Sequence, residues 1–109
     1  MAESSAEVRR VIESFCRELE RMGIACERVL LFGSHRLGTA TEGSDIDLVV
    51  VSRSFGHYND RERLESLGIA AARILEPVQA RGVTPEEVAS HALSPFLERV
   101  LQEQAVVVG

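Results

Sequence analysis

Two short apolar segments, Arg28–Phe32 and Asp45–Ser52, constrain the fold of this chain more than any other feature. The first is a run of β-prone residues that ends at Gly33 and Ser34, as a strand ends at a tight turn. The second alternates between two faces, and only one of them is wholly apolar. The apolar face carries Ile46, Leu48 and Val50, and the other face carries Asp45, Asp47 and Val49. The sequence therefore predicts two strands separated by loop material.

An amphipathic helix is predicted before these strands. Apolar residues recur there at steps of four and three along one face, at Val8, Ile12, Phe15, Leu19 and Met22. Ser4 and Glu7 form a capping-box pattern at its start, and Gly23 is suited to a left-handed end. We therefore expect this helix to begin near Ser4 and to stop at Gly23.

A second helix is predicted after the strands, capped by Asn59 or Asp60. Arg61 and Glu65 are spaced to pair on its outer side. We expect the inner side to carry Leu64, Leu67, Ala71 and either Ile74 or Leu75.

A third strand is predicted within Ile74–Val83, and two helix starts follow it. Thr84–Glu87 combines a cap, a proline and a capping-box acid, and Ser94 with Pro95 repeats the cap and proline. Ala105–Val108 is suited to an edge strand. Because helices alternate with strands, we expect one layered α/β domain over residues 1–109.

Composition excludes some functions. The chain has 109 residues and a net charge of -5, so it lacks the basic surface that a long nucleic acid requires. Its start is polar, and no apolar run reaches membrane-spanning length, so we expect a cytoplasmic protein that does not contact a membrane. Cys16 and Cys26 lack the neighbours of a zinc site, and we expect them to be buried free thiols.

The residues that suggest chemistry lie between the first two strands. Gly33 and Ser34 close one strand, ten residues follow, and Asp45 and Asp47 open the next strand. Two carboxylates at i and i+2 on a strand lie close together and repel unless a cation sits between them, and Mg²⁺ or Mn²⁺ suits such a pair. Gly33 leaves room for a phosphate, and the Ser34 hydroxyl and nearby amides can donate to it.

These parts predict a site for a metal-bound nucleoside triphosphate. Asp45 and Asp47 are the predicted metal ligands and catalytic residues, and Gly33, Ser34 and Arg36 are the predicted triphosphate-binding residues. Arg36 has an alternative interpretation as a plain surface charge. The predicted reaction is nucleotidyl transfer, in which an acceptor hydroxyl attacks the α-phosphorus and pyrophosphate leaves.

The segment GSHRLGTATEGSDIDLVVV resembles the signature of the DNA polymerase β-like nucleotidyltransferase superfamily, and especially its minimal nucleotidyltransferase branch. The resemblance extends over most of the chain. It implies a mixed β-sheet flanked by helices, Asp45 and Asp47 as metal ligands, and a nucleoside triphosphate, ATP in the first instance, as the donor. The family places a third acid on the strand after the long helix, where this chain carries Gln79, or alternatively Glu76 if the strand is shifted near Pro77.

Two functional hypotheses follow. The first is a nucleotidyltransferase that moves a nucleoside monophosphate, preferably AMP, to a hydroxyl on a separate acceptor. The resemblance implies a role as the antitoxin of a HEPN-type toxin, or else a homo-oligomer that completes the site. The second is a non-catalytic domain that binds nucleotide or docks to a partner, because Gln79 brings no charge and cannot act as a general base.

Overall fold

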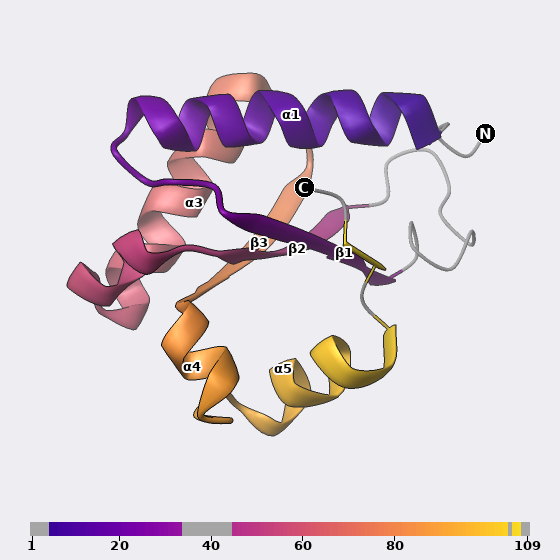
Figure 1. Ribbon diagram of the computed structural model, residues 1–109. Coiled ribbons are helices and arrows are strands. Elements are labelled where there is room, and N and C mark those ends of the chain that lie inside the picture. Colours follow the sequence, from indigo (N-terminus) through magenta and orange to yellow (C-terminus); the bar gives the residue numbers. More distant parts are fainter. Residues whose placement is uncertain (1–4, 34–44, 105, 108–109) are drawn as a thin grey trace.

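The computed structural model describes residues 5–33, 45–104 and 106–107, which form a mixed β-sheet with helices on both faces (Figure 1). The strand order is β3-β2-β1-β4. The strands are β1 (Arg28–Phe32), β2 (Ile46–Val51), β3 (Val78–Val83) and β4 (Val106–Val107). β1 is antiparallel to both β2 and β4, whereas β2 and β3 are parallel. The predicted mixed sheet flanked by helices is confirmed.

The helices lie in two layers (Figure 1). One layer contains α1 (Ser5–Arg21) and α3 (Asp60–Ile74), which also contact each other. The other contains the shorter helices α4 (Pro85–Ala89) and α5 (Pro95–Arg99), followed by a π-helical turn η2 (Val100–Gln104). A short 3₁₀ helix, η1 (Arg53–His57), connects β2 to α3 and was not predicted. None of the described helices is long and apolar enough to cross a membrane.

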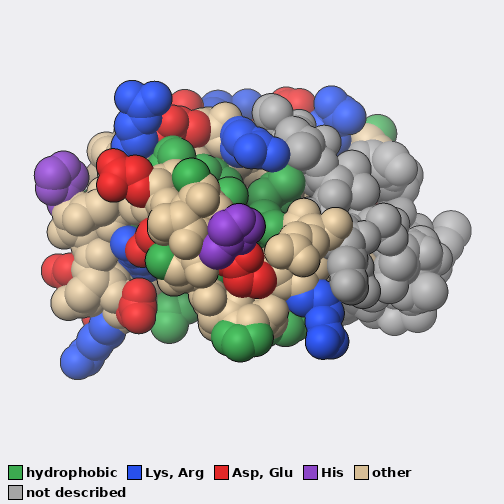
Figure 2. All heavy atoms as spheres, turned by 60° about the horizontal axis from the view of Figure 1, so that its bottom comes forward, with side chains coloured by type: hydrophobic (Ala, Val, Ile, Leu, Met, Phe, Trp, Pro, Cys, Tyr) green, Lys and Arg blue, Asp and Glu red, His purple; other side chains and the backbone are tan. Residues whose placement is uncertain are grey.

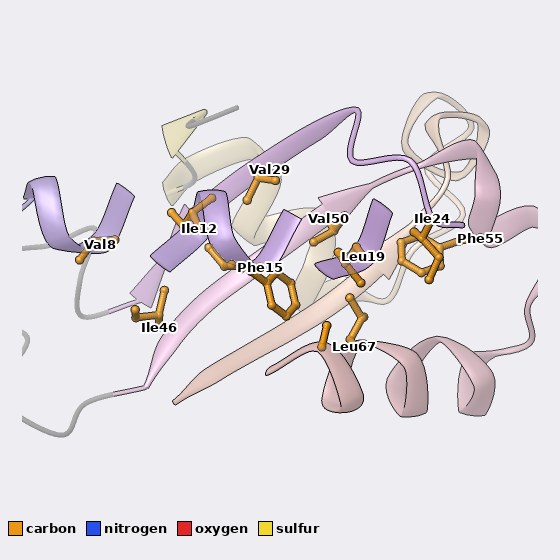
Figure 3. Packing of buried hydrophobic residues seen from close by; sticks show 12 residues of the cluster. Val8, Ile12, Phe15, Leu19, Ile24, Val29, Ile46, Val50, Phe55 and Leu67 are labelled. Atoms are coloured by element: carbon orange, nitrogen blue, oxygen red, sulfur yellow. The ribbon is translucent and has the colours of Figure 1, made fainter. Parts of the chain in front are cut away.

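The larger core fills the space between the sheet and the α1–α3 layer (Figure 3). Its α1 residues, Val8, Ile12, Phe15 and Leu19, are the buried positions of the predicted periodicity, and Met22 is partly buried against them. They pack on the apolar face of β2, as the alternation predicted, with Ile46, Leu48 and Val50 all fully buried. A smaller core on the other face joins β1 and β2 to η2 through Leu30, Phe32, Val49, Val51, Val83 and Val100.

The chain reverses direction after α1, at Gly23. Its φ of 87° is the left-handed conformation expected there, and the Ile24 amide donates to the Leu19 carbonyl at 2.9 Å. The reversal brings Cys26 beside α1, where it forms a disulfide with Cys16 across a Cα–Cα distance of 5.7 Å. The expectation of two free thiols is therefore wrong, because the left-handed turn at Gly23 brings together two cysteines that lie ten positions apart in the sequence.

The start of α3 is as predicted. The Asn59 side chain accepts from the Glu62 amide, and Glu62 accepts in return from the Asn59 amide. The predicted outer pair Arg61 and Glu65 is confirmed at 3.1 Å.

The inner side of α3 was only partly predicted. Leu67 and Ala70 are buried, and Ala71 and Ile74 pack against the core. Leu64 is 54% exposed, so it was wrongly placed on the inner side; of the two alternatives at the helix end, Ile74 is the one that packs inward, and Leu75 is 88% exposed. Leu75 lies past the helix end in a left-handed C-cap, and Leu64 lies on a flank because the buried stripe is centred on Leu67 and Ala70.

The caps of α4 and α5 are confirmed. Thr84 accepts from the Glu87 amide and Glu87 accepts from the Thr84 amide, with Pro85 in the first turn. The Ser94 side chain accepts from the Leu97 amide. β4 is the predicted edge strand. Ser4, Ala105 and Val108, which the sequence analysis included in caps or strands, lie outside the described residues.

Candidate functional site

Asp47 is at the centre of the candidate site because three strands meet there. It is half-buried, and its register partners are Phe32 at the end of β1 and Gln79 near the start of β3. Asp45 is the exposed residue directly before β2. The Ile46 amide between them donates to the Pro77 carbonyl at 2.7 Å, which fixes the start of β2 against the chain entering β3.

Gly33 lies against the Asp47 carboxylate. It follows β1 directly and has a φ of 73°, a conformation that favours glycine. A Cβ at this position would overlap Oδ2 of Asp47 and would lie 3.2 Å from its Cγ. The missing side chain is therefore what allows the bend after β1 to touch Asp47. The structure thus brings together two of the sequence-predicted site residues that are separated by thirteen positions along the chain.

The neighbouring position on β3 is occupied by Gln79. The β2–β3 register is unbroken from Ile46↔Val78 to Val51↔Val83 and sets Gln79 beside Asp47. Glu76 precedes the strand and lines a different hollow with Glu7 and Arg10 of α1. The register thus places Gln79, and not Glu76, opposite Asp47, and it contains no shift between Val78 and Val83.

A surface hollow of about 610 Å³ opens beside Asp47. The β-strands contribute Phe32, Asp47, Gln79 and Arg81 to its lining, α3 contributes Leu64 and α5 contributes Phe96. Arg81, Leu64 and Phe96 were not among the sequence-predicted site residues. For Arg81 a signal existed, since it lies two positions after Gln79 and therefore on the same face of β3. The other two come from helices whose placement the sequence did not predict.

Ser34 and Arg36, predicted to bind the triphosphate, lie outside the described residues. Among the residues that are described, no three His, Cys, Asp or Glu side chains cluster closely enough to hold a metal ion by themselves. Mg²⁺ accepts one or two carboxylates when substrate phosphates and water complete its octahedron. Asp45 and Asp47 would supply two carboxylates in number, although only Asp47 lines the hollow, and the Gln79 amide is a neutral neighbour of Asp47.

The opposite end of the same two strands is closed by Arg63 of α3. The Arg63 guanidinium donates to the carbonyls of Phe55, Tyr58 and Gly82 and to both carboxylate oxygens of Glu87. Its side chain is only 11% exposed. Arg63, through hydrogen bonding, lowers the pKa of Glu87, burial opposes that effect, and the Thr84 amide adds to it. This network satisfies the five N–H donors of the arginine.

The surface of the α4–α5 side is shown in Figure 2. Its described arginines are scattered over the face and do not form a stripe, and apolar side chains lie between them. A long nucleic acid requires continuous positive charge to displace its counterions. The described residues on the face shown in Figure 2 therefore form no continuous basic stripe.

Comparison with known families assigns the class of protein. The family described as "Nucleotidyltransferase domain" matches residues 8–105. The chain therefore belongs to the nucleotidyltransferase domain family, and the resemblance found on Gly33, Ser34, Asp45 and Asp47 is confirmed. Among curated proteins, none is similar enough to the chain to count as a match.

Solved structures agree on the fold. The chain is similar to a structure described as a toxin–antitoxin with AMP-PNP, at 22% identity and a TM-score of 0.62, over 93% of this chain and 72% of that one. It is also similar to a proposed nucleotidyltransferase from Sulfolobus solfataricus, at 19% identity and a TM-score of 0.58, over 98% of this chain and 87% of that one. At these sequence identities, the structural similarity shows a shared fold and no more.

Proposed function

We propose that residues 1–109 act as one minimal nucleotidyltransferase domain that moves a nucleoside monophosphate from a nucleoside triphosphate to an acceptor hydroxyl. ATP is the proposed donor and AMP the transferred group. The observation that carries the proposal is the close approach of Gly33 to the carboxylate of Asp47, which lines the hollow. Because Gly33 has no side chain, the end of β1 can approach this carboxylate, and the residue that follows in the sequence, Ser34, is proposed to bind phosphate beside the metal.

Each predicted site residue has a role in this proposal. Asp45 and Asp47 hold Mg²⁺ or Mn²⁺ together with the triphosphate. When bound, the metal neutralises the charge that develops on the attacking and leaving oxygens. Ser34 and the amides near it donate to the terminal phosphates, and Arg36 pairs with them. Arg81, exposed in the hollow on the same strand face as Gln79, adds positive charge where the phosphates enter.

Gln79 limits the rate of the proposed reaction. A carboxylate beside Asp47 would share the metal or accept the proton of the attacking hydroxyl, whereas an amide only orients that hydroxyl or a water. Transfer by the native chain is therefore slow. Restoring a carboxylate at this position should raise the rate by roughly 10²-fold, which is typical of a positioned general base.

The acceptor is proposed to be another protein. The structure described as a toxin–antitoxin with AMP-PNP combines, in that protein, a nucleotide analogue with a partner chain. This supports an antitoxin role in which a HEPN-type toxin supplies the acceptor hydroxyl. The exposed hollow also suits an acceptor from a second copy of this chain, so a homo-oligomer is the other arrangement to be tested.

A cytoplasmic location is also proposed, and the disulfide provides a test of it. The cytosol keeps most protein thiols reduced, so in a cytoplasmic chain the Cys16–Cys26 disulfide of the structure should be reduced, and both cysteines should react with a membrane-permeant maleimide added to intact cells. If both cysteines resist that reagent until a reductant is added, the proposed location is wrong.

Transfer is tested by incubating the chain with ATP labelled at the α-phosphate, Mg²⁺ and the HEPN-type protein. Asp47→Asn should reduce labelling of the acceptor by roughly 10²- to 10³-fold, the size of effect that follows the loss of one electrostatic contact at a reacting centre. Gln79→Glu should increase it. Glu86→Gln removes an exposed acid from α4, outside the hollow, and should leave labelling unchanged.

The second candidate function is docking without catalysis, and Gln79 is the observation that favours it. In that case neither the native chain nor Gln79→Glu labels any acceptor, while the HEPN-type protein still binds with the same affinity to both. Labelling by the Asp47→Asn variant at the native rate would exclude Asp47 from the reaction and would contradict the proposed site.

A further inference from the structure

Phe96 is an exposed aromatic residue next to the candidate site. It is 54% exposed, whereas Phe15 and Phe55 are fully buried and Phe32 is 9% exposed. Pro95 and the Ser94 cap fix the first turn of α5, on which Phe96 lies. Its ring packs edge-on against Phe32, with 6.1 Å between the centroids and 70° between the planes. The contact with Phe32 therefore holds the ring in place without burying it.

Phe96 lies near Asp47 through its contact with Phe32. Phe32 is the register partner of Asp47 across β1 and β2, and Phe32, Phe96 and Asp47 line the same hollow. Leu64 of α3, which is 54% exposed, adds a second apolar side chain to the lining. One carboxylate and two exposed apolar side chains thus share a volume of about 610 Å³, in the range of small-molecule sites.

We propose that the exposed ring of Phe96 stacks on the nucleobase of the bound nucleoside triphosphate, with Leu64 contacting the same base or its sugar. The inference rests on the proposed function, because it requires the phosphates to bind at Asp47. An exposed aromatic ring is stabilised when a flat, apolar surface covers it. Every nucleobase offers such a surface, whichever hydrogen-bond donors and acceptors it carries on its edge. The hollow then divides into a polar end for phosphates and an apolar end for the base.

The test compares a ligand that has a nucleobase with one that has only phosphates. Binding of Mg²⁺-ATP and of Mg²⁺-tripolyphosphate is measured by titration calorimetry for the native chain and for Phe96→Ala. The variant should bind ATP roughly 5- to 100-fold more weakly, as expected for one lost base–aromatic stack, and should bind tripolyphosphate as the native chain does. Leu75→Ala, which removes a side chain that is 88% exposed and does not line the hollow, serves as the control.

A second variant gives a direct optical signal. The chain contains no tryptophan, so Phe96→Trp introduces a single fluorophore at the proposed stacking position. Its emission should be quenched when ATP binds and should stay unchanged with tripolyphosphate, while its ATP affinity should remain at or above the native value.

Each other outcome overturns the inference. Equal losses for ATP and tripolyphosphate in Phe96→Ala would mean that the ring only supports the fold of the site. Unchanged binding of both would place Phe96 and Leu64 in a protein interface instead. If the native chain binds neither compound, the proposed function itself fails; if it binds both with equal affinity, only the stacking inference fails.

Discussion

The two ends of the β2–β3 ladder have opposite properties although they are built from the same pair of strands. At one end Asp47 faces Gln79, beside a bend at Gly33 and an open hollow. At the other end Val51 pairs with Val83, Ser52 and Thr84 are buried, and Arg63 closes the space above Gly82. We refer to these as the open end and the closed end.

The difference shows how the domain separates stability from chemistry. At the closed end, Arg63 hydrogen-bonds to Glu87 and to three backbone carbonyls, so changes there should act on the free energy of unfolding. At the open end, the acid Asp47 and the amide Gln79 line a hollow that is open to solvent, so changes there should act on ligand binding. A matched substitution at each end tests this separation.

The largest effect on stability is expected for Arg63→Met. The variant keeps an apolar stem but removes all five hydrogen bonds that Arg63 donates to the Glu87 carboxylate and to three carbonyls. Breaking such a pair costs about 3 kcal/mol, measured as the free energy of unfolding in urea. ATP affinity of the folded fraction should not change.

The control for Arg63→Met is Arg61→Met on the same helix. Arg61 pairs with Glu65 at 3.1 Å, but its side chain is 88% exposed, so its loss should cost less than about 0.5 kcal/mol. If both variants are equally stable, or if Arg63→Met abolishes ATP binding while it remains folded, the two ends are not independent.

A pair of glycine substitutions should give smaller effects, one on stability at the closed end and one on the transfer rate at the open end. At the closed end, a Cβ on Gly82 would lie 2.8 Å from the ring of Phe55, which is fully buried and cannot move away. Gly82→Ala should therefore destabilise the fold by about 1–3 kcal/mol through overpacking. The binding of ATP below the unfolding temperature should remain native.

At the open end, Gly33→Ala should act mainly on function. Its Cβ would displace the half-buried Asp47 carboxylate, and the positive φ at this position adds strain of about 1–2 kcal/mol. Because a small misplacement of a reacting group costs about 10²-fold in rate, transfer should fall far more than stability does. A Gly33→Ala variant with native transfer would show that the contact with Asp47 does not matter for the reaction.

Much of this fold was predictable because local rules determine it. The alternation in Ile46–Val51 identified both faces of β2, and the capping patterns at Asn59 and Thr84 identified the starts of α3 and α4. The apolar periodicity of α1 was equally clear. Each of these signals depends on residues fewer than about eight positions apart, so no knowledge of the tertiary structure was needed.

The remaining features depend on contacts between distant segments. The spacing of Gly33 and Asp47 suggested a common site, but the contact of the backbone with Oδ2 depends on the pairing of β1 with β2. The disulfide requires the turn at Gly23, and Phe96 reaches the hollow only because α5 packs over Phe32. Leu64 was wrongly assigned to the core because a helical pattern alone does not fix which flank of a helix faces the sheet.

The smallest expected effect is a pH dependence that arises at the closed end. The hydrogen bonds from Arg63 lower the pKa of Glu87 in the folded state below its ordinary value of 4.5. A lowered folded-state pKa contributes stability that is fully present above the unfolded-state pKa and is lost as the pH falls through the folded-state pKa. The native chain should therefore lose part of its unfolding free energy below about pH 4.5, and Glu87→Gln should remove that part of the pH dependence.

ATP affinity should not follow the same titration, since Glu87 does not line the hollow beside Asp47. Urea unfolding and calorimetric binding measured in parallel between pH 7 and about pH 3.5 check both statements; coincident profiles would mean that the closed end also controls the open one.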